Sequence, residues 1–249
     1  MKSQAMLDFS YKKSTVEYKN NLIQCYEFGT GKKIVFSFPS FPHSGLYYLW
    51  FLNHYDTSKV KFITFDLPGW AGYSQNIFKN KKVDINEYVE IAKEIIETNK
   101  IEKFSIIGYS FGGPLGVKLA SDMKNKIDKV VLVSTIINSK LIAHFKIPRL
   151  VKLVYKLNLS FLVKQKIFRN FDSFSRFMVE KENMPENFIT MYKDMIKHID
   201  SRVITEAAYQ LFNSDFTDYL RNIKDKDILV ANSMEEENMF KIEAEYIRK

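Results

Sequence analysis

The chain is poor in cysteine, and it has no long uninterrupted apolar run. Its 249 residues include one cysteine, Cys25, so an internal disulfide and a zinc site made of cysteines are both excluded. The first residues lack the continuous apolar core of a signal peptide. No stretch of about 18 apolar residues is present to form a transmembrane helix. We therefore expect a cytoplasmic protein.

The excess of positive charge is confined to one segment. The formal net charge is +8, and residues 140–170 hold eight Lys and Arg with no Asp or Glu. Without that segment, the chain carries 29 basic and 29 acidic residues and is neutral. No zinc-finger, RNP or KH signature is present. Because the charge is local, we expect no nucleic-acid partner.

The same basic segment is rich in Leu, Val and Phe, and it allows two interpretations. It could lie on an anionic membrane surface or admit lipid-like substrates. Alternatively, its apolar faces cover an active site while its basic faces are solvated. We favour the second interpretation.

Strand patterns and helix patterns alternate along most of the chain. Short β-branched and aromatic runs lie at 14–29, 32–38, 61–66, 103–108, 129–135 and 228–231, and the first contains a polar turn typical of a hairpin. Residues 83–100 have the apolar spacing of a helix, and Asp84 and Glu87 resemble a capping box at its start. This alternation predicts an α/β fold with a mostly parallel sheet and flanking helices.

The alternation stops after about residue 138. Residues 140–213 have helical patterns and no convincing strand, and the segment is too long for an ordinary loop. We therefore expect a sheet domain formed by 1–139 and 214–249, with a helical cap inserted at 140–213. Pro148 prevents a single long helix at the start of this insert.

Ser110 lies at the junction between a predicted strand and a predicted helix, with Gly108 and Gly112 on either side. A serine in the pattern G-x-S-x-G in this context is typical of a nucleophile elbow, a tight turn that exposes the hydroxyl. Its neighbours must be small because the serine backbone is strained. The amide that follows, from Phe111, can donate a hydrogen bond to a developing oxyanion at the start of the helix.

Three motifs together resemble the α/β-hydrolase superfamily: "GYSFGG" at 108–113, "DLPGWAGYS" at 66–74 and "FPSFPHSG" at 38–45. The resemblance implies that the amides of Phe41 and Phe111 form the oxyanion hole. Ser40 stands where the family carries glycine, which is a departure. His43, Trp70 and Tyr109 are then expected to border the substrate pocket, and Asp66 is expected to order its loop.

The resemblance also implies that a catalytic acid follows the strand at 228–231 and that a histidine follows the acid. Glu236 stands at the position of the acid, with Glu235 and Glu237 beside it. The four histidines, which all precede this position, are His43, His54, His144 and His198. Either the chain is a shortened hydrolase, which we favour, or it is a natural member that has lost or moved its base.

The activity implied by the resemblance is that of a serine hydrolase. Ser110 would attack a small or lipid-like carboxylic ester and form an acyl-enzyme, with activity impaired by the missing histidine. The alternative is a binding protein that keeps the fold without the chemistry. Neither interpretation requires a metal or an organic cofactor, and the sequence does not define an oligomeric state.

Overall fold

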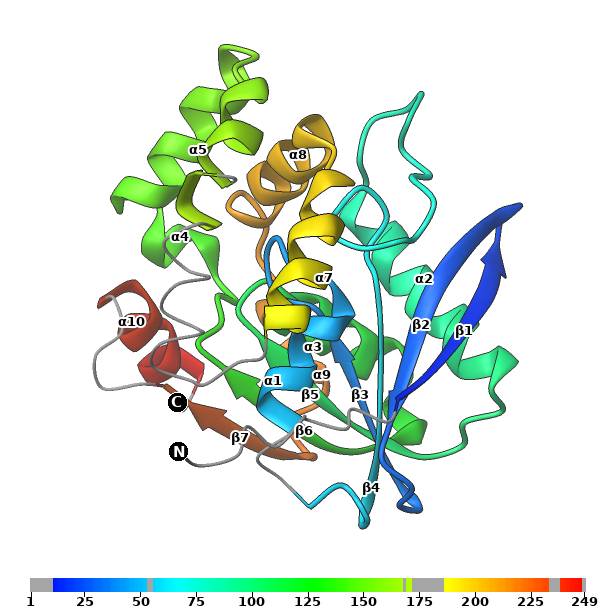
Figure 1. The fold of residues 1–249 in the computed structure, drawn as a ribbon. Helices are drawn as coiled ribbons and strands as arrows, with labels where there is room; N and C mark the ends of the chain where they lie inside the picture. Colours follow the sequence, from blue (N-terminus) through cyan, green and yellow to red (C-terminus); the bar gives the residue numbers. More distant parts are fainter. Residues whose placement is uncertain (1–10, 53–55, 168, 172–185, 233–237, 248–249) are drawn as a thin grey trace, which may run out of the picture.

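The computed structural model describes residues 11–52, 56–167, 169–171, 186–232 and 238–247, and these form one sheet with helices around it (Figure 1). The seven-stranded sheet has the order β1-β2-β4-β3-β5-β6-β7. Strands β1 and β2 pair antiparallel, as do β2 and β4, and the other neighbours pair parallel. The predicted α/β fold with a mostly parallel sheet is confirmed. The strands are β1 (Tyr11–Tyr18), β2 (Asn21–Phe28), β3 (Lys33–Phe38), β4 (Val60–Phe65), β5 (Phe104–Tyr109), β6 (Ile127–Val133) and β7 (Asp227–Ala231).

The predicted hairpin at the start of the chain is present. Its turn consists of Lys19 and Asn20, with φ of 50° and 60°. Two consecutive residues with positive φ are the mark of a type I′ turn, whose twist matches that of the paired strands.

In the chain, helices lie between the consecutive parallel strands and after the last of them. Helix α3 packs on β3, β5 and β6 and between α2 and α9. No helix in the described part of the chain is long and apolar enough to cross a membrane. The helices are η1 (Gly45–Tyr47), α1 (Tyr48–Leu52), α2 (Ile85–Thr98), α3 (Gly112–Asp122), η2 (Lys124–Lys126), α4 (Ser139–Ile142), α5 (Lys146–Lys156), α7 (Glu186–Lys197), α8 (Ser201–Leu211), α9 (Thr217–Asn222) and α10 (Asn238–Ile247).

Only one of the two residues of the predicted capping box caps α2. The Asp84 side chain caps the helix by accepting a hydrogen bond from the amide of Asn86 at 2.9 Å. The Glu87 side chain does not close the capping box, because it accepts hydrogen bonds from Tyr18 and Lys19 at the hairpin instead. The capping-box prediction is therefore correct for Asp84 and wrong for Glu87.

The helices between β6 and β7 leave and rejoin the sheet at one place. Asn138 forms an antiparallel bridge with Asp215, and the amide of Phe216 donates to the carbonyl of Ile137 at 2.9 Å. The predicted insert, 140–213, lies between these paired ends. Within it, residues 161–167 and 169–171 are also helical. Pro148 lies in the first turn of α5, where its missing N–H removes no helical hydrogen bond.

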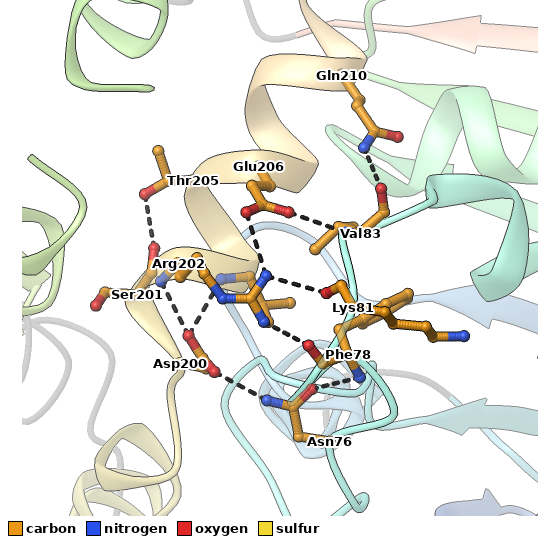
Figure 2. Close-up of polar contacts among 11 residues, drawn as sticks. Asn76, Phe78, Lys81, Val83, Asp200, Ser201, Arg202, Thr205, Glu206 and Gln210 are labelled. Carbon is orange, nitrogen blue, oxygen red and sulfur yellow. Dashed lines mark hydrogen bonds and ion pairs between the residues drawn. The ribbon is translucent and has the colours of Figure 1, made fainter. Parts of the chain in front are cut away.

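Helix α8 holds the insert to the sheet domain through a group of polar contacts (Figure 2). Arg202 donates to the carbonyls of Phe78 and Lys81, the latter at 3.1 Å. Glu206 accepts from the amide of Val83 at 2.9 Å, and Asp200 accepts from the side chain of Asn76 at 2.9 Å. Helix α5 packs on α8 and lies at the periphery of the molecule (Figure 1).

Candidate active site

Ser110 occupies a tight turn between β5 and α3, with a φ of 51°. A left-handed conformation is uncommon for a residue other than glycine and requires support from its surroundings. The Ser110 amide donates to the carbonyl of Val133 at 2.9 Å, and its carbonyl accepts from the amide of Gly113 at 3.0 Å and from the hydroxyl of Thr135 at 2.9 Å. The turn is therefore fixed by hydrogen bonds from both α3 and the neighbouring strand.

The glycines around Ser110 allow the strand and the helix to approach each other. A Cβ atom on Gly108 would lie 2.6 Å from the Cα atom of Gly113. A Cβ atom on Gly113 would lie 1.7 Å from the Thr135 hydroxyl. Both positions therefore exclude any side chain, which is the physical reason for the small-residue cluster in the sequence.

The two oxyanion candidates come from adjacent loops at the carboxyl ends of β3 and β5. Phe38 pairs with Gly108 in the parallel register, so the chain leaves both strands side by side. The rings of Phe41 and Phe111 lie 6.2 Å apart. Neither backbone amide donates a hydrogen bond to another residue that the structure describes. Both N–H groups are thus available to a ligand, as an oxyanion hole requires.

Ser40 stands where the family carries glycine. Its φ is not positive, so a serine side chain causes no backbone strain at this position. The residue is 2% exposed, and its hydroxyl has no hydrogen-bond partner among the described residues. A buried hydroxyl left in this state costs stability.

The His43 ring is enclosed by two tyrosines, which sequence reasoning did not single out. It stacks on Tyr47, with ring centroids 4.2 Å apart, and its Nδ1 is hydrogen-bonded to the hydroxyl of Tyr192 from α7. Burial lowers the pKa of His43 to about 4. The imidazole is therefore neutral at pH 7.

Tyr109 and Trp70, the other predicted pocket residues, have different surroundings. Tyr109 is half-buried near Tyr47, whose pKa is raised to about 12 by burial first and by Tyr109 second. Trp70 is 2% exposed, and its indole donates to the hydroxyl of Tyr88 at 3.0 Å. Its ring packs edge-on against Phe111, with centroids 4.6 Å apart. Trp70 thus packs against the rings of both oxyanion candidates.

Asp66 has the loop-ordering contacts that its position suggests. Its fully buried carboxylate accepts hydrogen bonds from the hydroxyls of Tyr26 and Ser44 and from the amides of Gly45 and Tyr73. Burial raises the pKa of Asp66, while these four donors favour the charged form. The carboxylate fixes the loops after β3 and β4 relative to each other.

The structure describes three of the four histidines and none of the three candidate acids. Glu235, Glu236, Glu237 and His54 lie outside the described residues. The histidines at 144 and 198 are exposed, and no described histidine forms a hydrogen bond with the Ser110 hydroxyl. Within the described ranges, then, no histidine is bonded to the hydroxyl of Ser110, the candidate nucleophile.

Two apolar cavities lie between the insert and the loop after β3, which contains Phe41, Pro42 and His43. One, of 430 Å³, extends from Phe41 to α5, α8 and the helical residues 161–167. The other, of 200 Å³, is lined by His43 and Tyr192, and both cavities share Ile167 and Asn170. An apolar ligand in the larger cavity would lie beside Phe41, a candidate oxyanion donor. A ligand in the smaller cavity would lie beside Pro42, the next residue.

A left-handed serine between a parallel strand and a helix, beside two amides that donate to no described residue, is the arrangement typical of a nucleophile elbow in an α/β protein. Residues 33–241 match the family model described as alpha/beta hydrolase fold, and the chain belongs to this family. The resemblance that the three motifs suggested is therefore confirmed. No sequence among the curated proteins matches the chain.

Solved structures with the same fold include several enzymes. A bromoperoxidase from Bacillus anthracis aligns with a TM-score of 0.73 and 15% identity, over 95% of this chain and 87% of that one. An esterase from Exiguobacterium antarcticum has a TM-score of 0.67 and 16% identity, over 88% and 80%. An enol-lactonase from Burkholderia xenovorans has a TM-score of 0.67 and 16% identity, over 95% and 86%. At these identities the likeness concerns the fold.

Proposed function

We propose that this protein is a serine hydrolase that acts on a small or lipid-like carboxylic ester. Ser110 attacks the ester carbonyl, the amides of Phe41 and Phe111 stabilise the oxyanion, and water then hydrolyses the acyl-enzyme. The observation that carries the proposal is the left-handed Ser110 turn, held by three hydrogen bonds beside two unused amides.

The substrate class is supported by the cavities and by the structural neighbours. The larger cavity is lined mainly by apolar side chains and begins at Phe41, one of the two oxyanion candidates, which supports it as the site of the acyl chain. The neighbours named as an esterase and an enol-lactonase act on carboxylic esters or lactones. Both reactions begin with the same attack on an acyl carbon.

The rate is proposed to be low in the described arrangement. A serine hydroxyl requires a base to accept its proton. Without one, an oxyanion hole and substrate binding retain roughly 10³–10⁴-fold acceleration over water. Glu236 remains the proposed acid, and it acts only if a histidine reaches Ser110.

Covalent labelling with a fluorophosphonate probe tests the nucleophile. We expect one label per chain at Ser110, none in Ser110→Ala, and unchanged labelling in Ser105→Ala, a control serine in β5, the strand that leads to Ser110. A series of p-nitrophenyl esters of increasing chain length then tests the acyl cavity. Absence of labelling in the folded wild-type protein contradicts the proposal.

The second candidate function is ligand binding without catalysis. It is favoured by the lack of a hydrogen bond between Ser110 and any described histidine. It predicts that a fluorescent fatty acid binds wild type and Ser110→Ala with equal affinity, while neither protein hydrolyses any ester in the series.

A further inference from the structure

The insert exposes an unusual concentration of apolar side chains. Seven of the eleven large apolar residues that are exposed in the described part of the chain lie between 147 and 162. Leu157 and Phe161 are 57% and 56% exposed. These side chains lose the hydrophobic stabilisation of burial as long as they face water. The seven residues are Ile147, Leu150, Leu153, Tyr155, Leu157, Phe161 and Leu162.

Cations without an ion-pair partner among the described residues lie in the same segment as these apolar side chains. In the basic segment, Lys140 pairs with Asp215, and Lys164 donates to the carbonyl of Lys197. The other cations form no ion pair with any residue that the structure describes, and residues 140–170 contain no acid. These unpaired cations are Lys146, Arg149, Lys152, Lys156, Lys166 and Arg169.

Helix α5 arranges the two kinds of residue in adjacent strips. With 3.6 residues per turn, Leu150, Leu153 and Leu157 share one strip, next to that of Arg149, Lys152 and Lys156. The inward strip contains the buried Pro148, and at its edge the partly exposed Tyr155 stacks on Tyr209 with ring centroids 3.9 Å apart. Leu153 and Leu157 therefore lie outside the face that packs on the protein, and Leu150 lies at its edge.

This arrangement differs from a solvated cover over the active site. In that interpretation, the apolar residues point inward and only the cations face water. That interpretation does not explain why the leucine strip is exposed. An apolar strip bordered by cations is instead the pattern of a helix that lies in the headgroup layer of a membrane.

We propose that this basic apolar face, formed by α5 and residues 157–166, docks on the surface of an anionic lipid bilayer. The cations would pair with lipid phosphates, and the leucines and Phe161 would enter the boundary of the acyl chains. A second copy of the chain is a poor occupant, because two such faces would oppose cations to cations without any acid between them.

The face is continuous with the larger cavity. Leu150 and Leu162 are exposed on the face and also line the cavity of 430 Å³ that extends to Phe41. A lipid chain can thus pass from the bilayer towards the oxyanion loop without crossing water. The docking itself rests on the charge and exposure of the insert, and not on the chemistry of Ser110.

Sedimentation of the full chain with vesicles tests the docking. We expect binding to vesicles of phosphatidylcholine mixed with phosphatidylglycerol, about tenfold weaker binding to phosphatidylcholine alone, and weakening by added salt. Ser110→Ala should bind like wild type, which separates this test from that of the proposed hydrolase. Absence of binding to the anionic vesicles overturns the proposal, as does capture by soluble heparin alone.

Two pairs of variants test the face itself. Lys152→Glu/Lys156→Glu should reduce vesicle binding at least about tenfold, because each cation near an anionic surface contributes to binding. The matched control is Lys32→Glu/Lys33→Glu, with the same charge change at the opposite end of the parallel strands. Equal losses in the two variants overturn the proposal.

The apolar part is tested by Leu153→Ser/Leu157→Ser, with Leu22→Ser, an exposed leucine of β2, as the control. At high salt, where electrostatic attraction is screened, we expect the insert variant to bind vesicles less than wild type does. The control should bind like wild type. All variants change exposed side chains, and circular dichroism with thermal unfolding verifies their fold. Unchanged binding of the folded leucine variant overturns insertion.

Discussion

The hydroxyl of Thr135 donates a hydrogen bond of 2.9 Å to the carbonyl oxygen of Ser110. Thr135 follows β6, so this bond joins the strand neighbouring the elbow to the residue with the uncommon backbone conformation. The same hydroxyl lies where a side chain on Gly113 would have to be. Thr135 therefore both holds the turn and explains why a glycine follows it.

Removal of this hydroxyl should weaken the turn. We expect Thr135→Ala to lower the free energy of unfolding by about 1 kcal/mol, the contribution of one hydrogen bond. It should also slow fluorophosphonate labelling of Ser110. Thr135→Ser, which keeps the hydroxyl, is the control and should label like wild type. Urea unfolding and the labelling rate are the two measurements, and equal behaviour of both variants contradicts the assigned role.

The Asp66 carboxylate should be sensitive to a change that retains its shape. In Asp66→Asn, the amide N–H₂ replaces an oxygen that accepts one hydroxyl and one backbone N–H, and the backbone donor then loses its partner. We expect a loss of roughly 1–3 kcal/mol in the free energy of unfolding. Asp56→Asn, at an exposed position, should be within about 0.5 kcal/mol of wild type. Similar stability of the two variants would argue against an ordering role for Asp66.

Glu243 should make stability depend on pH. Its buried carboxylate accepts hydrogen bonds from the amides of Ile137 and Asn138 at 3.2 Å, which docks α10 on the segment after β6. Burial is the main cause that raises the pKa of Glu243 to about 7, from an ordinary value of 4.5. The folded protein therefore holds this proton more tightly than the unfolded chain does.

The sign of the effect follows from this difference. The stabilisation by Glu243 is complete below pH 4.5 and is lost as the pH rises to about 7, with a total of up to about 3 kcal/mol. Glu243→Gln can keep one oxygen on both amides and should remove this slope. Glu245→Gln, at an exposed position on the same helix, should retain it. Urea unfolding at several pH values measures the slopes, and a wild-type slope in Glu243→Gln refutes the prediction.

Arg202 should hold the loop at 76–83 against α8. Arg202→Ala removes the hydrogen bonds to the carbonyls of Phe78 and Lys81 (Figure 2). We expect a loss of about 1–2 kcal/mol and faster hydrogen exchange in this loop. Arg221→Ala, which breaks an exposed ion pair, should cost less than about 1 kcal/mol. Mass spectrometry of hydrogen exchange provides the measurement, and unchanged exchange in the loop contradicts the prediction.

Local patterns predicted the elements well because each was decided within a few residues. The hairpin turn at Lys19 and Asn20 and the helix after Asp84 follow from local backbone preferences and capping. The side chain of Glu87 did not follow its local pattern. Tyr18 and Lys19, distant in the sequence, offered it a hydrogen bond and an ion pair that the capping box lacked.

By itself, the sequence determined the order of strands and helices, the elbow at Ser110 and the family, because glycine spacing and apolar periodicity act over short distances. Only the tertiary structure decided what surrounds His43, that the Phe41 and Phe111 amides bond to no described residue, and which leucines of the insert are exposed. Those properties depend on which distant segments pack together, and burial and hydrogen bonding are set by that packing rather than by neighbours along the chain.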